Sequence, residues 1–220
     1  MGAPLAIIDG PSTFANKFNV SRETVEKLDT YASLLKHWQK TINLVSPATL
    51  DTIWHRHMAD SAQLLKLAPV TSHRWVDLGS GAGFPGLVLA ILLRERPGVR
   101  VTLVESDTRK VAFLREVARQ TGLASVVDIC HARIEIASTH DRVGIVDVVT
   151  ARALAPLPKL LGLCQPFFGP QTVGLLLKGR EAERELEGAK ANWQFEAACE
   201  ASVTDAEARV LRITKLRAHD

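Results

Sequence analysis

Four glycines fall within eight residues in the segment VDLGSGAGFPG, residues 76–86, directly after the apolar pair that begins with Trp75. Glycine loses more conformational freedom on folding than any other residue, so such a cluster indicates a backbone that must turn tightly or let a ligand approach closely. A strand that leads into a glycine-rich turn and then an apolar helix is typical of ligand sites at the carboxyl edge of a parallel sheet. This segment constrains the fold and the function more than any other.

After residue 74 the chain alternates short apolar runs with segments of helical periodicity. RVTLVES, VVDICHA and VDVVTARA are apolar runs, whereas TRKVAFLREVARQTGL repeats its apolar residues every three or four positions. This alternation predicts a mostly parallel sheet with helices on both faces. The last two runs, WQFEAACEASV and ARVLRITKLR, have no long helix between them, so we expect a hairpin that contributes an antiparallel strand. The predicted fold class is therefore α/β, with a seven-stranded, Rossmann-like sheet.

The first seventy residues have a helical rhythm instead. We expect residues 1–20 to be a loose leader, because they contain glycine and proline and show no periodic apolar pattern. Ser21 is a suitable N-cap for a helix that ends near Ile42, and a second helix is expected from Thr49 to Pro69. The predicted organisation is a helical subdomain over residues 21–70 and one compact domain over residues 74–220.

Composition excludes several classes of protein. The formal net charge of +3 permits a nucleic-acid partner without requiring one. The three cysteines are far apart and lack metal-ligand spacing, so we expect reduced thiols, no metal site and a cytoplasmic protein. The longest apolar run, residues 87–93, is too short to span a bilayer, and we expect no membrane association.

Two ligands could occupy the glycine turn. Gly81, Gly83 and Gly86 satisfy the dinucleotide pattern G-x-G-x-x-G, and Glu105, at the end of the next predicted strand, suits the ribose hydroxyls of either ligand. Asp77 distinguishes between the two candidate ligands, because a carboxylate is unfavourable beside a pyrophosphate and favourable beside a cation. S-adenosylmethionine carries a sulfonium, an ammonium and no phosphate. We therefore predict that cofactor, with an NAD-binding oxidoreductase as the alternative.

Seven segments of the chain together resemble one known family. In chain order they are NLVSP, RHMADSAQLL, DLGSGAGFPGLVLAI, KVAFLREV, ARIE, ARALA and LLKG. They resemble the bacterial 16S ribosomal RNA guanine-N7 methyltransferases, the RsmG (GidB) family, from about residue 40 to about residue 180. The resemblance implies a class I S-adenosylmethionine-dependent methyltransferase that acts on 16S ribosomal RNA or the small ribosomal subunit, and we expect a monomer.

The resemblance also implies where the cofactor binds. Gly79 and Phe84 fall on cofactor-contact positions, Glu105 on the ribose position, and Arg152 near the methionine end. The full set is Asp77, Gly79, Gly81, Gly83, Phe84, Glu105, Ile134, Glu135 and Arg152, in which Ile134 and Glu135 match the pair that flanks the adenine. This chain has Ser-Gly-Ala-Gly at residues 80–83 where the family more often has Thr-Gly-Pro-Gly, and Glu105 where Asp is common.

The acceptor chemistry needs no catalytic base. Guanine N7 carries a lone pair and no proton, so catalysis consists mainly of holding the reactants in near-attack geometry. We expect five positioning residues around the acceptor, namely Asn43, His55, Arg56, Lys178 and Arg180. Asn43 could equally serve the turn between two helices. His55 and His57 are two residues apart and share no helix face, so a metal site is not expected; a polar network of His57, Asp60 and Ser61 is.

The sequence argues against two other methyl acceptors and leaves a third class of acceptor open. The segment TARALAPL lacks the (N/D)PP(Y/F/W) motif of enzymes that methylate exocyclic amines, and no Pro-Cys motif supports attack at pyrimidine C5. A class I methyltransferase that acts on a small molecule or a protein remains an alternative to the ribosomal RNA enzyme. Arg109, Lys110, Arg115 and Arg119 are spaced along the helical segment TRKVAFLREVARQTGL, and we expect them to form a solvated face, with contact to RNA phosphates as the second possibility.

Overall fold

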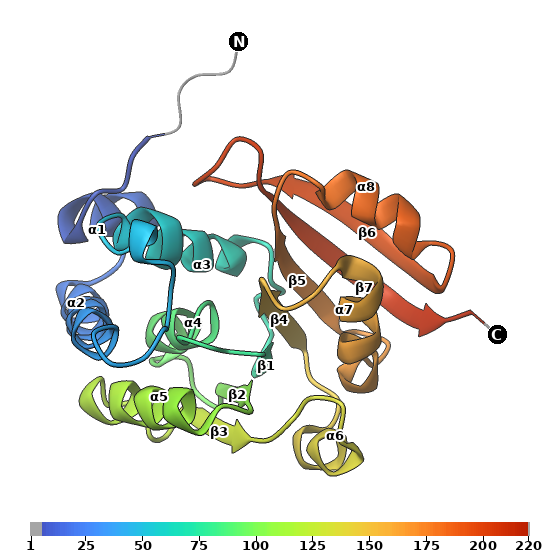
Figure 1. The fold of residues 1–220 in the computed structure, drawn as a ribbon, viewed down its shortest axis with the longest axis horizontal. Coiled ribbons are helices and arrows are strands. Elements are labelled where there is room, and N and C mark those ends of the chain that lie inside the picture. The colour runs from blue at the N-terminus through green and yellow to red at the C-terminus, as the bar shows by residue number, and fades with distance from the viewer. Residues whose placement is uncertain (1–5, 220) are drawn as a thin grey trace.

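A single seven-stranded sheet forms the centre of the molecule in the computed structural model, which describes residues 6–219 (Figure 1). The strand order is β3-β2-β1-β4-β5-β7-β6. Strands β1 to β5 run parallel, and β7 pairs antiparallel with both β5 and β6. The strands are β1 (Arg74–Leu78), β2 (Arg100–Glu105), β3 (Val127–His131), β4 (Val148–Arg152), β5 (Val173–Lys178), β6 (Trp193–Ala201) and β7 (Arg209–Ala218). The predicted α/β class and C-terminal hairpin are confirmed.

Helices cover both faces of this sheet (Figure 1). Along each strand, successive side chains alternate between two apolar cores, so that Trp75 belongs to the core under α1–α5 and Val76 to the core under α6–α8. The helices are α1 (Pro11–Phe18), α2 (Arg22–Trp38), α3 (Asp60–Ala62), α4 (Gly86–Leu93), α5 (Thr108–Gln120), α6 (Ala137–Val143), α7 (Leu157–Cys164) and α8 (Ala182–Ala189). Short helical turns are η1 (Pro47–Thr49), η2 (Trp54–Ala59), η3 (Gln63–Lys66) and η4 (Gln165–Phe167).

The N-terminal segment differs from the expected loose leader. Residues 11–18 form helix α1, with Pro11 in the first turn, where its missing N–H costs nothing. Phe14 is fully buried, and its ring centroid lies 4.7 Å from that of Phe18 and 5.5 Å from that of Trp54. One aromatic contact within the helix and one with Trp54 of η2 therefore order a segment whose own sequence has little helical periodicity.

The helical subdomain is also less regular than expected. Helix α2 ends at Trp38 rather than near Ile42, and the single helix expected from Thr49 to Pro69 is divided among η1, η2, α3 and η3. Segment η2 is a π-helix, a rare conformation that is frequent at functional sites. It carries Arg56 and His57 and leads directly into Asp60.

Strand β1 lies between β2 and β4, and this order places a ligand crevice at the carboxyl edge of the sheet. The chain leaves β1 toward β2 on one side and later returns to β4 on the other, so the loops after β1 and β4 diverge at this point. The loop after β1 is the glycine-rich segment, and the loop after β4 begins at Arg152. The fold therefore brings the two predicted cofactor loops to one edge.

Candidate active site

The glycine loop over residues 79–85 has a backbone that only glycine adopts easily. Gly79, Gly81 and Gly83 have φ angles of +65°, +57° and +92°. A Cβ at Gly79 would lie 2.6 Å from Leu154 Cδ1, and one at Gly83 would lie 2.4 Å from Leu87 Cδ1. A Cβ at Gly81 would find its nearest atom, Gly79 O, at 3.7 Å. Two of the glycines are thus needed for packing, whereas Gly81 presents open backbone to a ligand.

Two buried carboxylates accept hydrogen bonds from the backbone of this loop and of the helix that follows it. Glu105 Oε2 accepts a hydrogen bond from Gly81 N–H at 2.8 Å, and its Oε1 accepts from Ser106 N–H and Asp107 N–H, both at 2.8 Å. Asp77 accepts from Gly86 N–H at 3.3 Å and from Thr150 Oγ1 at 2.8 Å. Burial raises the pKa of Asp77 to about 6, against the opposing effect of these hydrogen bonds.

The hydrogen bonding of the loop fits S-adenosylmethionine better than a dinucleotide. Loops that bind a pyrophosphate present free N–H groups at a helix N-terminus. Here the N–H groups of Gly81 and Gly86 donate to carboxylates, and that of Gly83 donates to Ser80 O at 2.7 Å. An anionic ligand would meet occupied donors and negative charge, whereas a cationic ligand would meet favourable charge.

An aromatic stack connects the loop to the N-terminal helices. The Phe84 ring lies between Tyr31 of α2, 5.0 Å away, and His57 of η2, 4.8 Å away, as measured between ring centroids. Arg152 Cζ lies 5.1 Å from the centroid of the same ring. Tyr31 is fully buried and donates its hydroxyl to Ala82 O. The helical subdomain therefore holds the cofactor loop directly.

A cavity of about 680 Å³ opens beside the loop, at the carboxyl ends of β4 and β5. Four cationic side chains line it, those of Arg56, Arg152, Lys178 and Arg180. Carboxylates line it too, from Asp60, Glu181, Glu185 and Asp205. The cavity is thus a charged chamber at the carboxyl edge of the sheet, where open α/β sheets bind their ligands.

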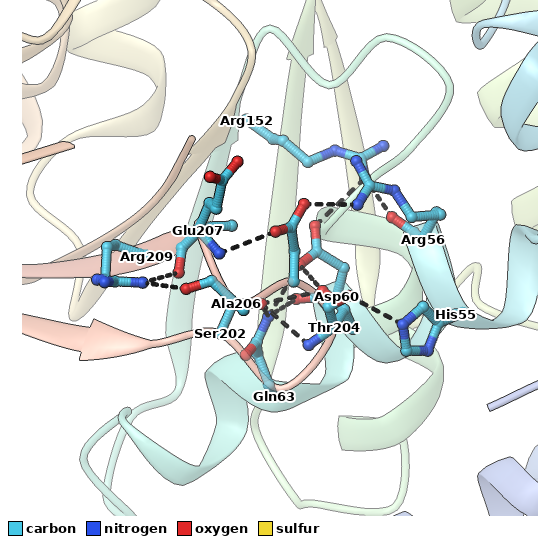
Figure 2. Close-up of polar contacts among 12 residues, drawn as sticks. His55, Arg56, Asp60, Gln63, Arg152, Ser202, Thr204, Ala206, Glu207 and Arg209 are labelled. Carbon is cyan, nitrogen blue, oxygen red and sulfur yellow. Dashed lines mark hydrogen bonds and ion pairs between the residues drawn. The ribbon is translucent and has the colours of Figure 1, made fainter. Parts of the chain in front are cut away.

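Ion pairs fix most of these charges. Lys178 Nζ lies 2.7 Å from Glu185 Oε2 and donates to Ala155 O at 3.1 Å. Arg56 Nη1 lies 2.8 Å from Asp205 Oδ2. The contacts of Arg56 belong to a wider network between residues 55–63, Arg152 and the loop after β6 (Figure 2).

Comparison with known proteins gives this arrangement a family. The family model described as GidB, rRNA small subunit methyltransferase G, matches residues 24–214. A curated ribosomal RNA small subunit methyltransferase G from Parvibaculum lavamentivorans is 51% identical over 97% of this chain and 92% of its own length. Another of that name, from Methylobacterium nodulans, is 52% identical over 90% of this chain and 91% of its own length.

The chain belongs to the GidB family. The predicted resemblance is confirmed, and with it the assignment as an S-adenosylmethionine-dependent methyltransferase of ribosomal RNA. Solved structures agree on the fold at low identity. A putative O-methyltransferase from Klebsiella pneumoniae has a TM-score of 0.61 at 14% identity and covers 96% of this chain and 97% of its own. The cofactor-bound structure of Rv0187 has a TM-score of 0.59 at 15% identity, with 86% and 90% covered.

Some predicted acceptor residues of this GidB-family chain lie elsewhere than expected. Arg56, Lys178 and Arg180 line the cavity, but Asn43 and His55 do not. Asn43 lies exposed in the turn after α2, where its side chain faces Gln39 Nε2 at 3.5 Å. His55 accepts at Nδ1 from Ile8 N–H at 3.2 Å and bonds Thr204 O through Nε2 at 2.9 Å. Both its ring nitrogens are occupied, so His55 joins the N-terminal segment to the loop after β6.

His57, rather than His55, is the histidine at the cavity. It is buried, and its Nε2 lies 2.8 Å from Thr49 Oγ1. Burial, together with the charges of Arg152 and Arg56, lowers the pKa of His57 to about 3. The imidazole therefore stays neutral at physiological pH and contributes shape and stacking. Within residues 6–219, no group of three or more side chains could hold a metal ion.

The remaining predicted cofactor residues lie along the adjacent strand ends. Ile134 is buried in the core under α6–α8, and Glu135 beside it is exposed. Helix α5 begins after Glu105, and its Arg109, Arg115 and Arg119 are exposed, as expected for a solvated face, whereas Lys110 is half-buried. In the described range, no helix is both long and apolar enough to cross a membrane.

Sequence reasoning missed Tyr31 and underestimated Asp60. Tyr31 occupies one position of an ordinary apolar helix face, and nothing in its local pattern marks the contact with Ala82. Asp60 was expected in a polar network with His57 and Ser61; it also forms an ion pair with Arg152, at 3.6 Å. Burial raises the pKa of Asp60, and the guanidinium of Arg152 opposes that rise.

Proposed function

We propose that this GidB-family methyltransferase transfers a methyl group from S-adenosylmethionine to N7 of a guanine in 16S ribosomal RNA. The observation that carries the proposal is the juxtaposition of two unlike parts. A glycine loop whose N–H groups are taken by carboxylates adjoins a chamber lined by four cationic side chains and four carboxylates. The first part suits a cationic cofactor, and the second offers charged donors and acceptors to a nucleotide base and its flanking phosphates.

The loop and its neighbours are proposed to hold the cofactor. S-adenosylmethionine supplies, when bound, a methyl group on a positively charged sulfur. Gly81 leaves the backbone open for close approach, and Glu105 offers a carboxylate to ribose hydroxyls. Arg152, packed against Phe84, supplies a cation for the carboxylate of the methionine end. Asp77 places negative charge beneath the loop, and Ile134 with Glu135 borders the adenine end.

The cavity is proposed to hold the base. Guanine N7 is already a lone-pair acceptor, so no residue has to remove a proton. The pKa of His57, lowered to about 3, makes this imidazole a poor base, which agrees with that requirement. Lys178 is held in place by Glu185 and by Ala155 O, so its ammonium is positioned before the substrate arrives. Arg56 and Arg180, which are more exposed, are placed to meet O6 or the flanking phosphates.

The setting of the reaction is part of the proposal. We infer a monomer that acts in the cytoplasm on a single-stranded loop of 16S ribosomal RNA, alone or within the small subunit. Base edges are accessible in such loops, whereas A-form helices hide them. Light scattering of the purified protein at micromolar concentration would test the monomer, because a dimer would double the measured mass.

The decisive experiment is methyl transfer from labelled S-adenosylmethionine to small ribosomal subunits that lack the modification. Borohydride reduction followed by aniline cleavage then maps any N7-methylguanine. A single strong cleavage in a 16S loop is the expected result. Label in RNA without cleavage would overturn the N7 assignment. If no label entered subunits or deproteinised 16S RNA while S-adenosylhomocysteine still bound, the acceptor would be another molecule.

A further inference from the structure

Asp60 presents an unusual carboxylate oxygen at the wall of the cavity. Its Oδ1 accepts hydrogen bonds from Thr204 Oγ1 and from Gln63 Nε2, both at 2.9 Å (Figure 2). Its Oδ2 accepts no hydrogen bond from any residue in the range 6–219. The ion pair between Oδ2 and Arg152 Nη1 measures 3.6 Å, which is too long for a good hydrogen bond. The side chain is only 15% exposed and lines the cavity, so Oδ2 is an acceptor with unused lone pairs that a molecule in the cavity can reach.

Two other carboxylates of the cavity have close cationic partners. Both oxygens of Asp205 are used, Oδ2 by Arg56 at 2.8 Å and Oδ1 by Glu207 N–H at 2.9 Å. Glu185 Oε2 lies 2.7 Å from the ammonium of Lys178 and also accepts from Leu157 N–H. Among the residues that the structure describes, Asp60 has no cation within hydrogen-bond distance, so its Oδ2 is the more readily available to donors of a bound base.

A guanine that presents N7 for methylation turns its opposite edge away from the cofactor. That edge carries two adjacent donors, N1–H and the N2 amine, whereas adenine carries an acceptor at N1. Proteins that bind unstacked bases recognise this edge with hydrogen bonds. A carboxylate oxygen can accept from both guanine donors and repels the N1 lone pair of adenine.

We propose that Asp60 is the residue that selects guanine, by accepting hydrogen bonds at Oδ2 from N1–H and the N2 amine of the acceptor base. The inference rests on the proposed function. Thr204 and Gln63 fix Oδ1, so the carboxylate cannot rotate away, and the guanidinium of Arg152, 3.6 Å from Oδ2, favours its ionised form. The same negative charge would stabilise the cationic base that forms as N7 is methylated.

The test combines one substitution at Asp60 with the removal of the N2 amine from the target guanosine of the RNA. Asp60→Asn keeps an oxygen for Thr204 and Gln63 but places an amide donor where Oδ2 lies. The RNA is 16S RNA ligated to carry inosine, which lacks the N2 amine, at the mapped position. We expect the wild-type kcat/KM to fall about 10- to 100-fold from guanosine to inosine RNA, the range for a hydrogen bond to a charged group. In Asp60→Asn the ratio between the two RNAs is expected to be within about twofold of unity.

Control measurements separate this inference from the alternatives. Affinity for S-adenosylhomocysteine is expected to be unchanged in Asp60→Asn; a large loss would overturn the inference by placing Asp60 on the cofactor's ammonium. Asp29→Asn, at an exposed site on α2, removes the same charge and is expected to keep the wild-type ratio. Asp60→Ala, which offers no donor, is expected to give the same ratio as Asp60→Asn.

Two results would decide against the inference in distinguishable ways. If the wild type methylates guanosine RNA and both Asp60 variants retain the wild-type preference over inosine, Asp60 does not recognise the base, and the proposed function stands. If the wild type methylates no guanosine RNA, the proposed function itself fails, and this inference fails with it.

Discussion

The two halves of the active site are built in different ways. In the cofactor half, backbone conformation does the positioning: glycines with positive φ angles turn the loop, and the carboxylates of Asp77 and Glu105 accept its N–H groups. In the acceptor half, side-chain ion pairs such as Lys178–Glu185 and Arg56–Asp205 do the positioning. The glycine loop of the cofactor half has no room for an added side chain at Gly79 or Gly83. The cations of the acceptor half can exchange a carboxylate partner for a phosphate of the RNA when the substrate binds.

The largest effect is expected from a change in the backbone half. Gly83→Ala forces a side chain into a φ of +92° and within 2.4 Å of Leu87 Cδ1 and 2.8 Å of Tyr31 Oη. Left-handed strain and overpacking together predict a loss of about 3–4 kcal/mol in the free energy of unfolding, with loss of S-adenosylhomocysteine binding. Urea denaturation and calorimetric titration measure both quantities. The control is Gly188→Ala in α8, where no atom lies within 4 Å, and a gain of about 0.5–1 kcal/mol is expected.

The buried carboxylate of the same half predicts a dependence of stability on pH. The pKa of Asp77 is raised to about 6 in the folded protein, so the folded state binds a proton more tightly than the unfolded chain does. The contribution of Asp77 to stability is therefore greatest at low pH and is lost as the pH rises through 6, by up to about 3 kcal/mol. We expect the stability of wild type minus that of Asp77→Asn to fall between pH 4 and pH 6.5. A difference that rises over this range would contradict the assignment, and Asp29→Asn controls for the loss of one charge.

In the ion-pair half, Lys178→Met is expected to act on turnover. The change removes the ammonium and leaves Glu185 without its 2.7 Å partner, while the aliphatic stem is kept. We expect kcat/KM for ribosomal RNA to fall about 30-fold, or about 2 kcal/mol, with affinity for S-adenosylhomocysteine within twofold of wild type. Lys190→Met provides the control, because its partner Glu187 is an exposed neighbour in α8 and no effect on kcat/KM is expected. Equal losses in cofactor affinity and turnover would show that the two halves are not separable.

The smallest effect on stability is expected at the contact between α2 and the glycine loop. Tyr31→Phe keeps the stack on Phe84 but leaves Ala82 O without its buried donor. The expected loss is about 1–2 kcal/mol in stability, with weaker cofactor binding and unchanged kcat at saturating cofactor. Thr30→Val, next to it, removes a hydroxyl that bonds Glu26 O at an exposed helix surface, and a change of less than about 0.5 kcal/mol is expected. Unaltered cofactor affinity in Tyr31→Phe would mean that the helical subdomain does not hold the loop.

The same division explains how much the sequence could predict. The sheet, the glycine loop, Asp77 and Glu105 are marked by local signals, because alternation, glycine spacing and strand ends are all encoded within a few residues. The roles of Tyr31, Asp60 and His55 depend on partners that lie 51, 144 and 149 residues away in the chain. The structure also places His55 outside the cavity lining, whereas Arg56 and His57 of the same π-helical turn line it. Nothing in the local sequence predicts this rare turn, so the sequence could not distinguish these neighbours.

The contacts that join residues 55–63 to the loop after β6 have a consequence for how the two halves of the site depend on the rest of the fold (Figure 2). Thr204 bonds Asp60, and Asp205 pairs with Arg56, across 144 and 149 residues of chain. The glycine loop and the backbone groups that its two carboxylates bind lie within residues 77–107. One wall of the acceptor cavity therefore forms only when the loop between β6 and β7 packs against η2 and α3. A substitution that shifts this hairpin would change the acceptor cavity and leave the local hydrogen bonds of the glycine loop in place.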